Sequence, residues 1–467
     1  MSAPAGVPEL VSTSPATGEE LGRVAASSAA GIDRSVAAAA DAFAGSPWPR
    51  DARARQSAMD ALAAALEARA GELVELLVRE TGKIVREARL EVAGSVDALR
   101  YNAGVARHLD GGAGTLHDGS VAHVVREPVG PTAFIVPWNW PVLLLMRDLA
   151  PALAAGVTAV VKPSPATPLV TELLMEIGRE AGVPEGLVSV VHGDAEAGRA
   201  LVEHPDVRAV AFTGSTETGR AVLRSAAADF TRVLLELGGK GAAVVFADAD
   251  VEAAVDALVP SAFVTSGQMC MACTRILVEE PIAAAVREGV LRRVRDLRVG
   301  DPFDPRTDLG PLISEAHRER VLGYVEAARR DGVLHCGGEA VDVAGAGAYV
   351  TPAVVTGVDR ESVVVREEVF GPLVTVESFA GEADGFALAN ASPYGLVASV
   401  WTRDVSRAWR AARALDAGTV WVNRYNRSFA EAPSGGVRQS GLGRTRGLEG
   451  VRQFTETKHV NWEVSAP

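Results

Sequence analysis

Between residues 132 and 237, five short apolar runs alternate with segments of helical periodicity. The runs are TAFIV at 132–136, VTAVV at 157–161, LVSVV at 187–191, VRAVAF at 207–212 and VLLEL at 233–237. Helices are expected between them, over residues 141–155, 168–182, 195–203 and 216–227. Strands that alternate with helices form βαβ units with right-handed crossovers. The sequence therefore predicts an α/β fold with a doubly wound parallel sheet.

The segments on either side of this region predict further elements. Residues 34–110 place Ala, Leu and Val at three- and four-residue spacing, which is typical of packed helices. A second alternating series from about 241 to 423 predicts a second α/β domain, with strands near 274–280, 373–379, 396–402 and 419–423 and helices near 281–296, 313–330 and 404–415. The tail FTETKHVNWEV has β-type residues. Because a lone strand needs a partner, we expect it to pair with residues 119–128 or with the sheet of another subunit.

Composition excludes several classes of protein. The chain has 467 residues, which suggests about three domains, and its net charge of −13 argues against a nucleic-acid-binding surface. The most apolar stretch, residues 131–161, is interrupted by prolines, Arg147 and Asp148, so no membrane partner is expected. Three cysteines are too few for a disulfide framework, and the N-terminus lacks the basic and apolar regions of a signal peptide. We therefore expect a cytoplasmic protein.

Polar residues and glycines follow the five expected strands of the first sheet. PWNWP at 137–141 follows the first strand and Lys162 the second, while Gly193, Gly214-Ser215 and Glu236 stand at the ends of the third, fourth and fifth. Open parallel sheets bind ligands at the carboxyl ends of their strands. Five such positions in register predict a binding crevice. The glycines of GSTETG match neither the GxGxxG pattern nor a phosphate-binding P-loop, so glycine spacing alone is weak evidence for a nucleotide.

Cys270 lies in SGQMCMACTR, between Gly267 and an expected strand. Most cysteines are buried apolar residues, and Cys273 and Cys336 fit that description. A nucleophilic cysteine instead needs a lowered pKa, access to substrate and a nearby base, so both alternatives stay open for Cys270 on spacing alone. Further cysteine or histidine ligands at zinc-binding spacing are missing nearby, and no metal site is expected.

Taken together and in order along the chain, these motifs resemble the aldehyde dehydrogenase superfamily. The resemblance covers nearly the whole chain and includes PWNWP, KPSPATP at 162–168, FTGSTETG at 212–219, ELGGK at 236–240, GQMC at 267–270, EEVFGP at 367–372 and SGGVRQSGLGRTRG at 434–447. It implies an NAD(P)-binding domain over 1–117 and 130–237, a catalytic domain over 238–423 and a small β oligomerisation element over 118–129 and 454–467. Such an element implies a homodimer or a homotetramer.

The resemblance also implies roles for individual residues. Cys270 matches the nucleophile that attacks an aldehyde carbonyl, Asn139 and the Cys270 backbone N–H match the oxyanion hole, and Glu236 matches the base that activates water against the thioester. The cofactor is implied to be NAD or NADP. Residues at positions that contact or line the cofactor crevice are Trp138, Lys162, Ser164, Pro165, Gly193, Gly214, Ser215, Gly238, Glu368 and Phe370.

Several positions depart from the common pattern of the family. Pro165 stands where many members carry a glutamate that binds the ribose hydroxyls and repels a 2′-phosphate, so NADP is expected to be tolerated. The substrate pocket is expected to include Arg147, Met271, Asn426, Ser428 and Ser434. A buried Arg147 needs a partner, which a substrate carboxylate could supply, and this favours a short polar or anionic aldehyde.

Three alternatives concern the same pocket. Arg147 could instead pair with a carboxylate of the protein, and an arginine there together with a methionine after the nucleophile also occurs in relatives that oxidise aromatic aldehydes. A CoA-acylating semialdehyde dehydrogenase is a further alternative, although it would have little need of Glu236.

Overall fold

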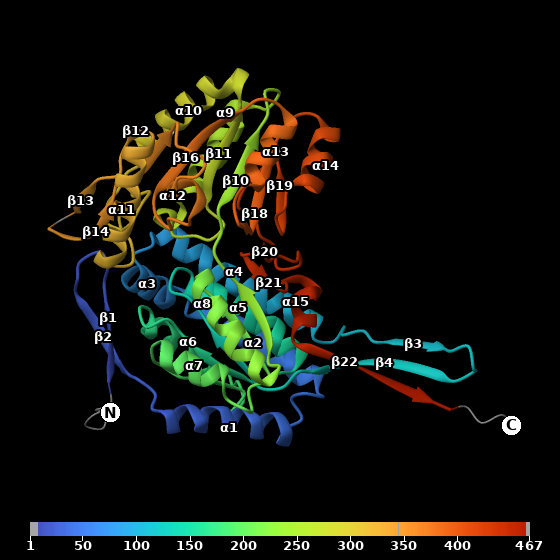
Figure 1. The fold of residues 1–467 in the computed structure, drawn as a ribbon. Coiled ribbons are helices and arrows are strands. Elements are labelled where there is room, and N and C mark those ends of the chain that lie inside the picture. Colours follow the sequence, from blue (N-terminus) through green and yellow to red (C-terminus); the bar gives the residue numbers. More distant parts are fainter. Residues whose placement is uncertain (1–7, 344, 464–467) are drawn as a thin grey trace.

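The computed structural model describes residues 8–343 and 345–463. Two α/β lobes lie one above the other, and a narrow β arm projects from the lower lobe (Figure 1). The lower lobe contains a six-stranded sheet and the upper lobe a seven-stranded sheet. The predicted α/β fold with doubly wound parallel sheet is confirmed.

The six-stranded sheet has the order β21-β9-β8-β5-β6-β7. All five predicted strands are present as β5 (Thr132–Ile135), β6 (Ala159–Lys162), β7 (Val188–Val190), β8 (Ala209–Thr213) and β9 (Arg232–Glu236), and they run parallel. From β5 the chain builds outward through β6 and β7 and then returns to place β8 on the other side of β5. The strand order therefore reverses between β5 and β8, which is where such sheets bind ligands. The two-residue strand β21 (Gly441–Leu442) closes the edge beside β9 in the antiparallel sense.

The helices of the crossovers match the predicted ranges within two residues. They are α5 (Pro141–Ala155), α6 (Pro168–Glu180), α7 (Ala195–Val202) and α8 (Thr216–Ala226). Proline opens both α5 and α6, where its missing N–H costs nothing, and α5 ends at Gly156 in a left-handed conformation with φ of 99°. Leu145, Leu149 and Leu153 of α5 are buried in the core of this lobe.

The predicted N-terminal helical region forms four helices. They are α1 (Ala29–Gly45), α2 (Ala52–Ala68), α3 (Ala70–Thr81) and α4 (Val85–Val105). Helices α2 and α3 pack on α4 and α6, and α4 packs on α5, so that α4 reaches the region between the lobes. A hairpin of β1 (Glu9–Thr13) and β2 (Glu20–Ala25) runs beside α6.

The seven-stranded sheet has the order β12-β15-β16-β11-β10-β18-β19. The four predicted strands are β11 (Cys273–Glu279), β16 (Leu373–Phe379), β18 (Val397–Trp401) and β19 (Thr419–Val422), and the three predicted helices are α10 (Ala283–Asp296), α11 (Glu315–Asp331) and α14 (Val405–Ala414). The sequence pattern did not predict β10 (Gly241–Val245), β12 (Val333–Cys336), β15 (Ala353–Thr356), α9 (Val251–Phe263), α12 (Val363–Arg366) or α13 (Glu382–Asn390). Most of these strands are short, and β12 is an antiparallel edge strand.

The arm is a three-stranded antiparallel sheet of β3 (Gly112–Thr115), β4 (Val121–Pro128) and β22 (Thr455–Trp462). Strand β22 pairs with β4 along its whole length, from Thr455 opposite Pro128 to Trp462 opposite Val121. The prediction that residues 119–128 pair with the C-terminal strand is confirmed. Residues 464–467 of the predicted oligomerisation element, and residues 1–7 of the predicted first domain, lie outside the described residues. The division into three domains stays a prediction.

The remaining elements are small. They are β13 (Ala340–Val343), β14 (Ala346–Val350), β17 (Tyr394–Gly395), β20 (Val437–Arg438), the helix α15 (Gly447–Gln453) and three short 3-10 helices at Ala227–Asp229, Val264–Gly267 and Glu280–Ile282. No helix in the described part of the chain is both long and apolar enough to cross a membrane.

Candidate active site

A cavity of about 260 Å³ lies between the two lobes. Its walls come from α4, α5, the end of β9, the loop before β11, β18 and the segment from 426 to 446. All eight residues predicted as catalytic or substrate-binding line it: Asn139, Arg147, Glu236, Cys270, Met271, Asn426, Ser428 and Ser434. Residues up to about 300 positions apart in the chain therefore meet in one place. Their individual roles stay predictions.

Cys270 follows a strained turn and precedes β11. Thr265 and Ser266 have φ of 49° and 55°, a conformation that residues with a side chain rarely adopt. The backbone carbonyl of Cys270 packs so closely on Gly239 that a side chain there would approach it to 2.4 Å. Burial, together with the carboxylates of Glu368 and Glu236, raises the pKa of the Cys270 thiol to about 12, against the opposing effect of Arg147. A thiolate here consequently needs additional positive charge, or a base that removes the proton.

Asn139 lies in the loop between β5 and α5 and is almost fully buried. Its Nδ2 donates a hydrogen bond to the Gln268 carbonyl at 2.9 Å, which ties this loop to the turn that carries Cys270. An amide nitrogen has two N–H groups, so one is left to face a developing oxyanion in the cavity.

A buried ion pair, not identified from the sequence, supports that loop. The Lys83 ammonium pairs with the Glu91 carboxylate and also donates to the Asn139 carbonyl at 2.7 Å. The other Glu91 oxygen accepts hydrogen bonds from the backbone N–H groups of Val142 (2.8 Å) and Leu143 (3.1 Å), at the start of α5. One pair thus fixes both the candidate oxyanion residue and the helix that follows it.

Glu87, one turn before Glu91 on α4, anchors the turn before Cys270, the candidate nucleophile. Its carboxylate accepts a hydrogen bond from the Thr265 N–H at 2.7 Å. The only sequence signal was the four-residue spacing of Lys83, Glu87 and Glu91. Charges with that spacing usually lie on the exposed face of a helix, and only the tertiary packing buries these three.

Glu236 is the last residue of β9 and is nearly fully buried. Its Oε2 lies 3.6 Å from Nη1 of Arg147, and its Oε1 has no hydrogen-bond partner among the residues described. Burial raises the pKa of Glu236 from 4.5 to about 7, against the opposing effect of Arg147. A carboxyl group with a pKa near neutrality and a free oxygen can exchange protons with water at physiological pH.

The prediction that Arg147 needs a substrate anion as its partner is wrong. Its Nε and Nη2 donate to the two carboxylate oxygens of the neighbouring Asp148 at 3.0 and 2.8 Å, and Nη2 also donates to Thr213 Oγ1 at 2.6 Å. This two-pronged pair neutralises the guanidinium within the protein. The alternative stated above, in which Arg147 pairs with a carboxylate of the protein, describes the structure.

The residues predicted to hold the adenosine side of a dinucleotide lie along the carboxyl edge of the six-stranded sheet. Lys162 ends β6, and its ammonium donates to the Pro163 carbonyl at 3.0 Å. Burial lowers the pKa of Lys162 to about 8. Pro165 is exposed on the turn that follows, next to Ser164. No carboxylate therefore stands at the position of Pro165.

Backbone groups line the neighbouring ends of β7 and β8. Gly193 precedes α7 with φ of 155°, and a side chain on it would meet Ala197 at 2.6 Å. Gly214 and Ser215 lie between β8 and α8, at the point where the strand order reverses. The Ser215 hydroxyl caps α8 by accepting from the Thr218 N–H at 3.2 Å. This end of the crevice presents backbone and small side chains, which leaves room for a ligand to approach.

The residues predicted for the nicotinamide side lie between the lobes. Glu368 accepts a hydrogen bond from the Gly239 N–H at 2.9 Å, and burial raises its pKa to about 7. A side chain on Gly238 would come within 2.5 Å of the other Glu368 oxygen, so glycine keeps that oxygen accessible. The rings of Trp138 and Phe370 meet edge to face at 5.5 Å.

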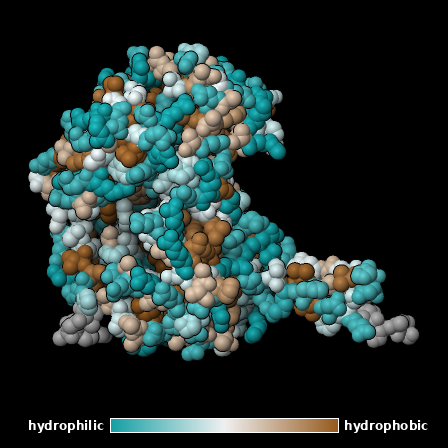
Figure 2. Space-filling model, viewed as in Figure 1, coloured by the Kyte–Doolittle hydropathy of each residue, from teal (hydrophilic) through white to brown (hydrophobic). Residues whose placement is uncertain are grey.

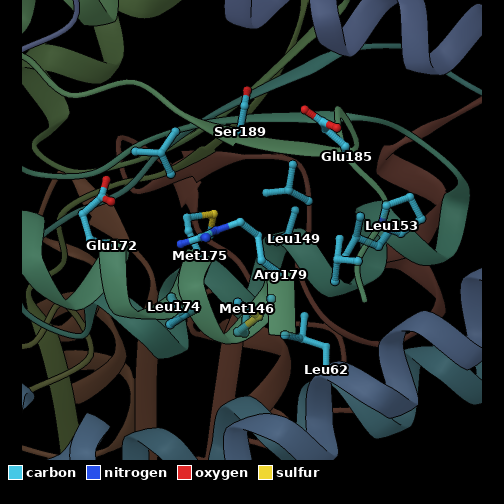
Figure 3. A pocket seen from close by; sticks show the side chains of 15 residues that line it. Leu62, Met146, Leu149, Leu153, Glu172, Leu174, Met175, Arg179, Glu185 and Ser189 are labelled. Atoms are coloured by element: carbon cyan, nitrogen blue, oxygen red, sulfur yellow. The ribbon is translucent and has the colours of Figure 1, made fainter. Parts of the chain in front are cut away.

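Another cavity lies elsewhere in the molecule. It has a volume of about 640 Å³, and Leu and Met side chains of α2, α5 and α6 line it, with Glu172, Arg179 and Glu185 among them (Figure 3). It contains none of the eight predicted residues and no cysteine. Within the described ranges no group of three or more His, Cys, Asp or Glu could hold a metal ion.

Comparison with known proteins supplies an independent observation. The model of the aldehyde dehydrogenase family matches residues 3–460. An NAD-dependent aldehyde dehydrogenase from Sinorhizobium meliloti is 38% identical, with a TM-score of 0.96 over 98% of this chain and 92% of that one. Betaine aldehyde dehydrogenase from Staphylococcus aureus, crystallised with NAD⁺, is 35% identical, with a TM-score of 0.94 over 97% of this chain and 91% of that one.

Proposed function

Because the chain belongs to the aldehyde dehydrogenase family, we propose that it oxidises a short polar or anionic aldehyde to the carboxylic acid, with NAD or NADP as the acceptor. It is an oxidoreductase that acts on aldehydes. The observation that carries the finer proposal is that Cys270, Asn139 and Glu236 line one cavity next to the crevice of the six-stranded sheet.

The proposed reaction uses each of the three residues once. The Cys270 thiolate attacks the aldehyde carbon and forms a thiohemiacetal, whose oxyanion accepts hydrogen bonds from the Asn139 amide and the Cys270 N–H. NAD or NADP, which Lys162 and Glu368 would hold, would supply the acceptor for the hydride, and the acyl group would stay on Cys270 as a thioester. Glu236 takes a proton from the water that attacks this thioester. The carboxylic acid is then released, and the Cys270 side chain is free for the next cycle.

The residues of the crevice suit a dinucleotide. The free oxygen of Glu368 and the ammonium of Lys162 match the hydroxyl groups of two riboses, and Gly193, Gly214 and Gly238 keep the backbone open where a ligand must approach. Pro165 leaves the position beside the adenosine ribose without a carboxylate. The absence of a negative charge there supports the use of NADP as well as NAD.

The substrate class rests on the polar groups of the cavity. Asn426, Ser428 and Ser434 line it, where they can bind a polar substrate. A neutral aromatic aldehyde is a second candidate. Asp148 already pairs with Arg147, so this arginine needs no anionic substrate. Met269, Met271 and Trp140 line the same cavity. A CoA-acylating enzyme would have little need of the Glu236 carboxylate, because CoA and not water takes the acyl group. We therefore favour hydrolysis over acyl transfer to CoA.

We also propose a homodimer or homotetramer assembled through the arm. Val124, Val125 and Trp462 are exposed on it, and Figure 2 shows apolar patches on this projecting sheet. A three-stranded sheet that stands clear of both lobes buries little apolar surface unless another subunit covers it.

A panel of aldehydes with NAD and with NADP tests the proposal through the absorbance of the reduced cofactor. We expect activity with both cofactors, and faster oxidation of succinic semialdehyde than of long alkanals. A strong preference for benzaldehyde would support the second candidate instead. Product that forms only when CoA is added would overturn the hydrolytic reaction.

A further inference from the structure

Arg446 brings a second guanidinium to the catalytic cavity. It lines the cavity together with Cys270, Glu236 and Arg147. Its backbone carbonyl accepts from the Gly450 N–H at 2.8 Å, but its guanidinium, unlike that of Arg147, makes no hydrogen bond and no ion pair with any residue in 8–343 or 345–463. The neighbouring Arg444 provides a contrast, since it donates to the carbonyls of Gly436 at 3.2 Å and Gly443 at 2.7 Å. The cavity therefore contains one arginine with a partner in the protein and one without.

The backbone of Arg446 is held in an unusual conformation. Its φ is 60° and its ψ 170°, a region that almost only glycine occupies. Both neighbours are fixed to cavity walls: Thr445 exchanges two backbone hydrogen bonds with Ser434 at 2.8 and 2.9 Å, and the Gly447 N–H donates to Ala430 at 2.8 Å. The strain is thus imposed at a position that lines the cavity.

The charges around Arg446 leave it without a committed counter-ion. Asp148 is already paired with Arg147, and Glu236 is the candidate base. Asp97 lines the same cavity and its charge favours the protonated form of Arg446, but it is exposed and forms no ion pair within the described ranges. Burial and the charge of Arg147 lower the pKa of Arg446 to about 10, so it remains positive at neutral pH. A positive charge in a cavity of this size attracts an anion.

We infer that Arg446 is the specificity residue of this cavity, and that it binds the carboxylate of an aldehyde acid whose formyl group reaches Cys270. This inference rests on the proposed function and replaces Arg147 as the residue for an anionic substrate. A guanidinium can donate two parallel hydrogen bonds to a carboxylate. Asn426, Ser428 and Ser434 add neutral donors along the same wall.

Matched substrates test the inference. Each anionic aldehyde is compared with a neutral counterpart: succinic semialdehyde with its methyl ester, and 4-formylbenzoate with benzaldehyde. Arg446→Gln should lower kcat/KM for the two anions about 10- to 100-fold, mainly through KM, because a hydrogen bond to a charged group is lost. The neutral counterparts should change less than about twofold. Arg446→Lys keeps the charge without the fork and should lie between.

Arg452→Gln is the matched control. It removes one positive charge from α15, six residues farther along, where Arg452 pairs with Glu449 outside the cavity. It should leave all four substrates unchanged. Equal losses for anions and neutral counterparts in Arg446→Gln, or the same selectivity change in Arg452→Gln, would overturn the inference.

A binding measurement separates this inference from the proposed function. Glutarate should protect Cys270 from alkylation by iodoacetamide in the wild type, and the protection should drop at least tenfold in Arg446→Gln. This readout needs no turnover. Oxidation of neutral aldehydes without such protection would refute the role of Arg446 alone, whereas protection without oxidation of any aldehyde would refute the proposed function.

Discussion

Glu236→Gln changes one atom of the candidate base and has a stability consequence that depends on pH. Burial raises the pKa of Glu236 from 4.5 to about 7. The folded protein therefore favours the protonated form of Glu236. The stability that this form contributes is present below pH 4.5 and is lost as the pH rises toward 7. The cost of holding the charged carboxylate grows between pH 4.5 and 7 and then stays constant.

The size of this cost follows from the same values. A pKa raised from 4.5 to about 7 corresponds to about 3 kcal/mol at high pH, and to about 1 kcal/mol at pH 5. Gln is neutral at every pH and nearly the same shape. Relative to the wild type, Glu236→Gln should therefore gain about 2 kcal/mol of stability between pH 5 and pH 8.

Unfolding midpoints in denaturant at the two pH values measure this difference directly. Glu326→Gln is the control, because Glu326 is an exposed carboxylate on α11. It should show no such trend. A stability difference between Glu236→Gln and wild type that is the same at pH 5 and pH 8 would falsify the raised pKa.

The catalytic readout of the same variant is independent. If Glu236 activates the water, Gln should allow one burst of reduced cofactor per active site and then turn over about 10²- to 10⁴-fold more slowly. In the wild type, steady-state turnover should fall about tenfold from pH 8 to pH 6 as the carboxylate is protonated. Turnover of Glu236→Gln at the wild-type rate would show that another group is the base.

Four further substitutions have defined outcomes. Cys270→Ala should lower dehydrogenase activity more than about 10³-fold while the Kd for NADH, from fluorescence titration, stays within about twofold; the fully buried Cys273 on β11 should not replace it. Pro165→Glu should raise the ratio of kcat/KM with NAD to that with NADP at least about tenfold, which is about 1.4 kcal/mol; an unchanged ratio means that another residue sets the preference. Arg147→Ala should cost about 3–5 kcal/mol in denaturant unfolding because it leaves Asp148 buried and unpaired, and a loss confined to KM for anions would contradict the observed pair. Lys83→Met should cost a similar amount and lower kcat about tenfold with little change in KM; a normal kcat would show that the Asn139 loop needs no such support.

Much of the fold follows from local pattern. Each strand of the first sheet is a short, mostly apolar run, and Pro opens α5 and α6 while Asp194 and Ser215 cap α7 and α8, so both the elements and their parallel arrangement could be predicted within about two residues. Four-residue strands were predicted where they alternate with clear helices, as β5 and β6 do, whereas β12 and β15 were not predicted. Register also placed Lys162, Thr213 and Glu236 at strand ends facing one edge, and the pairing of β4 with β22 followed from the need of a lone strand for a partner.

What only the tertiary structure decided is the state of each charge. The sequence shows that Arg147 and Asp148 are adjacent, but only the packing of α5 directs both into the interior, where they neutralise each other. The sequence shows Lys83, Glu87 and Glu91 only as charged residues at helical spacing. In the folded protein they are buried, and Lys83 and Glu87 bind the backbone of Asn139 and Thr265. Arg446 looked like one residue of a glycine-rich loop, and its entry into the cavity depends on hydrogen bonds to residues distant in the chain. Desolvation and pairing energies depend on every neighbour in space, and so no local pattern encodes them.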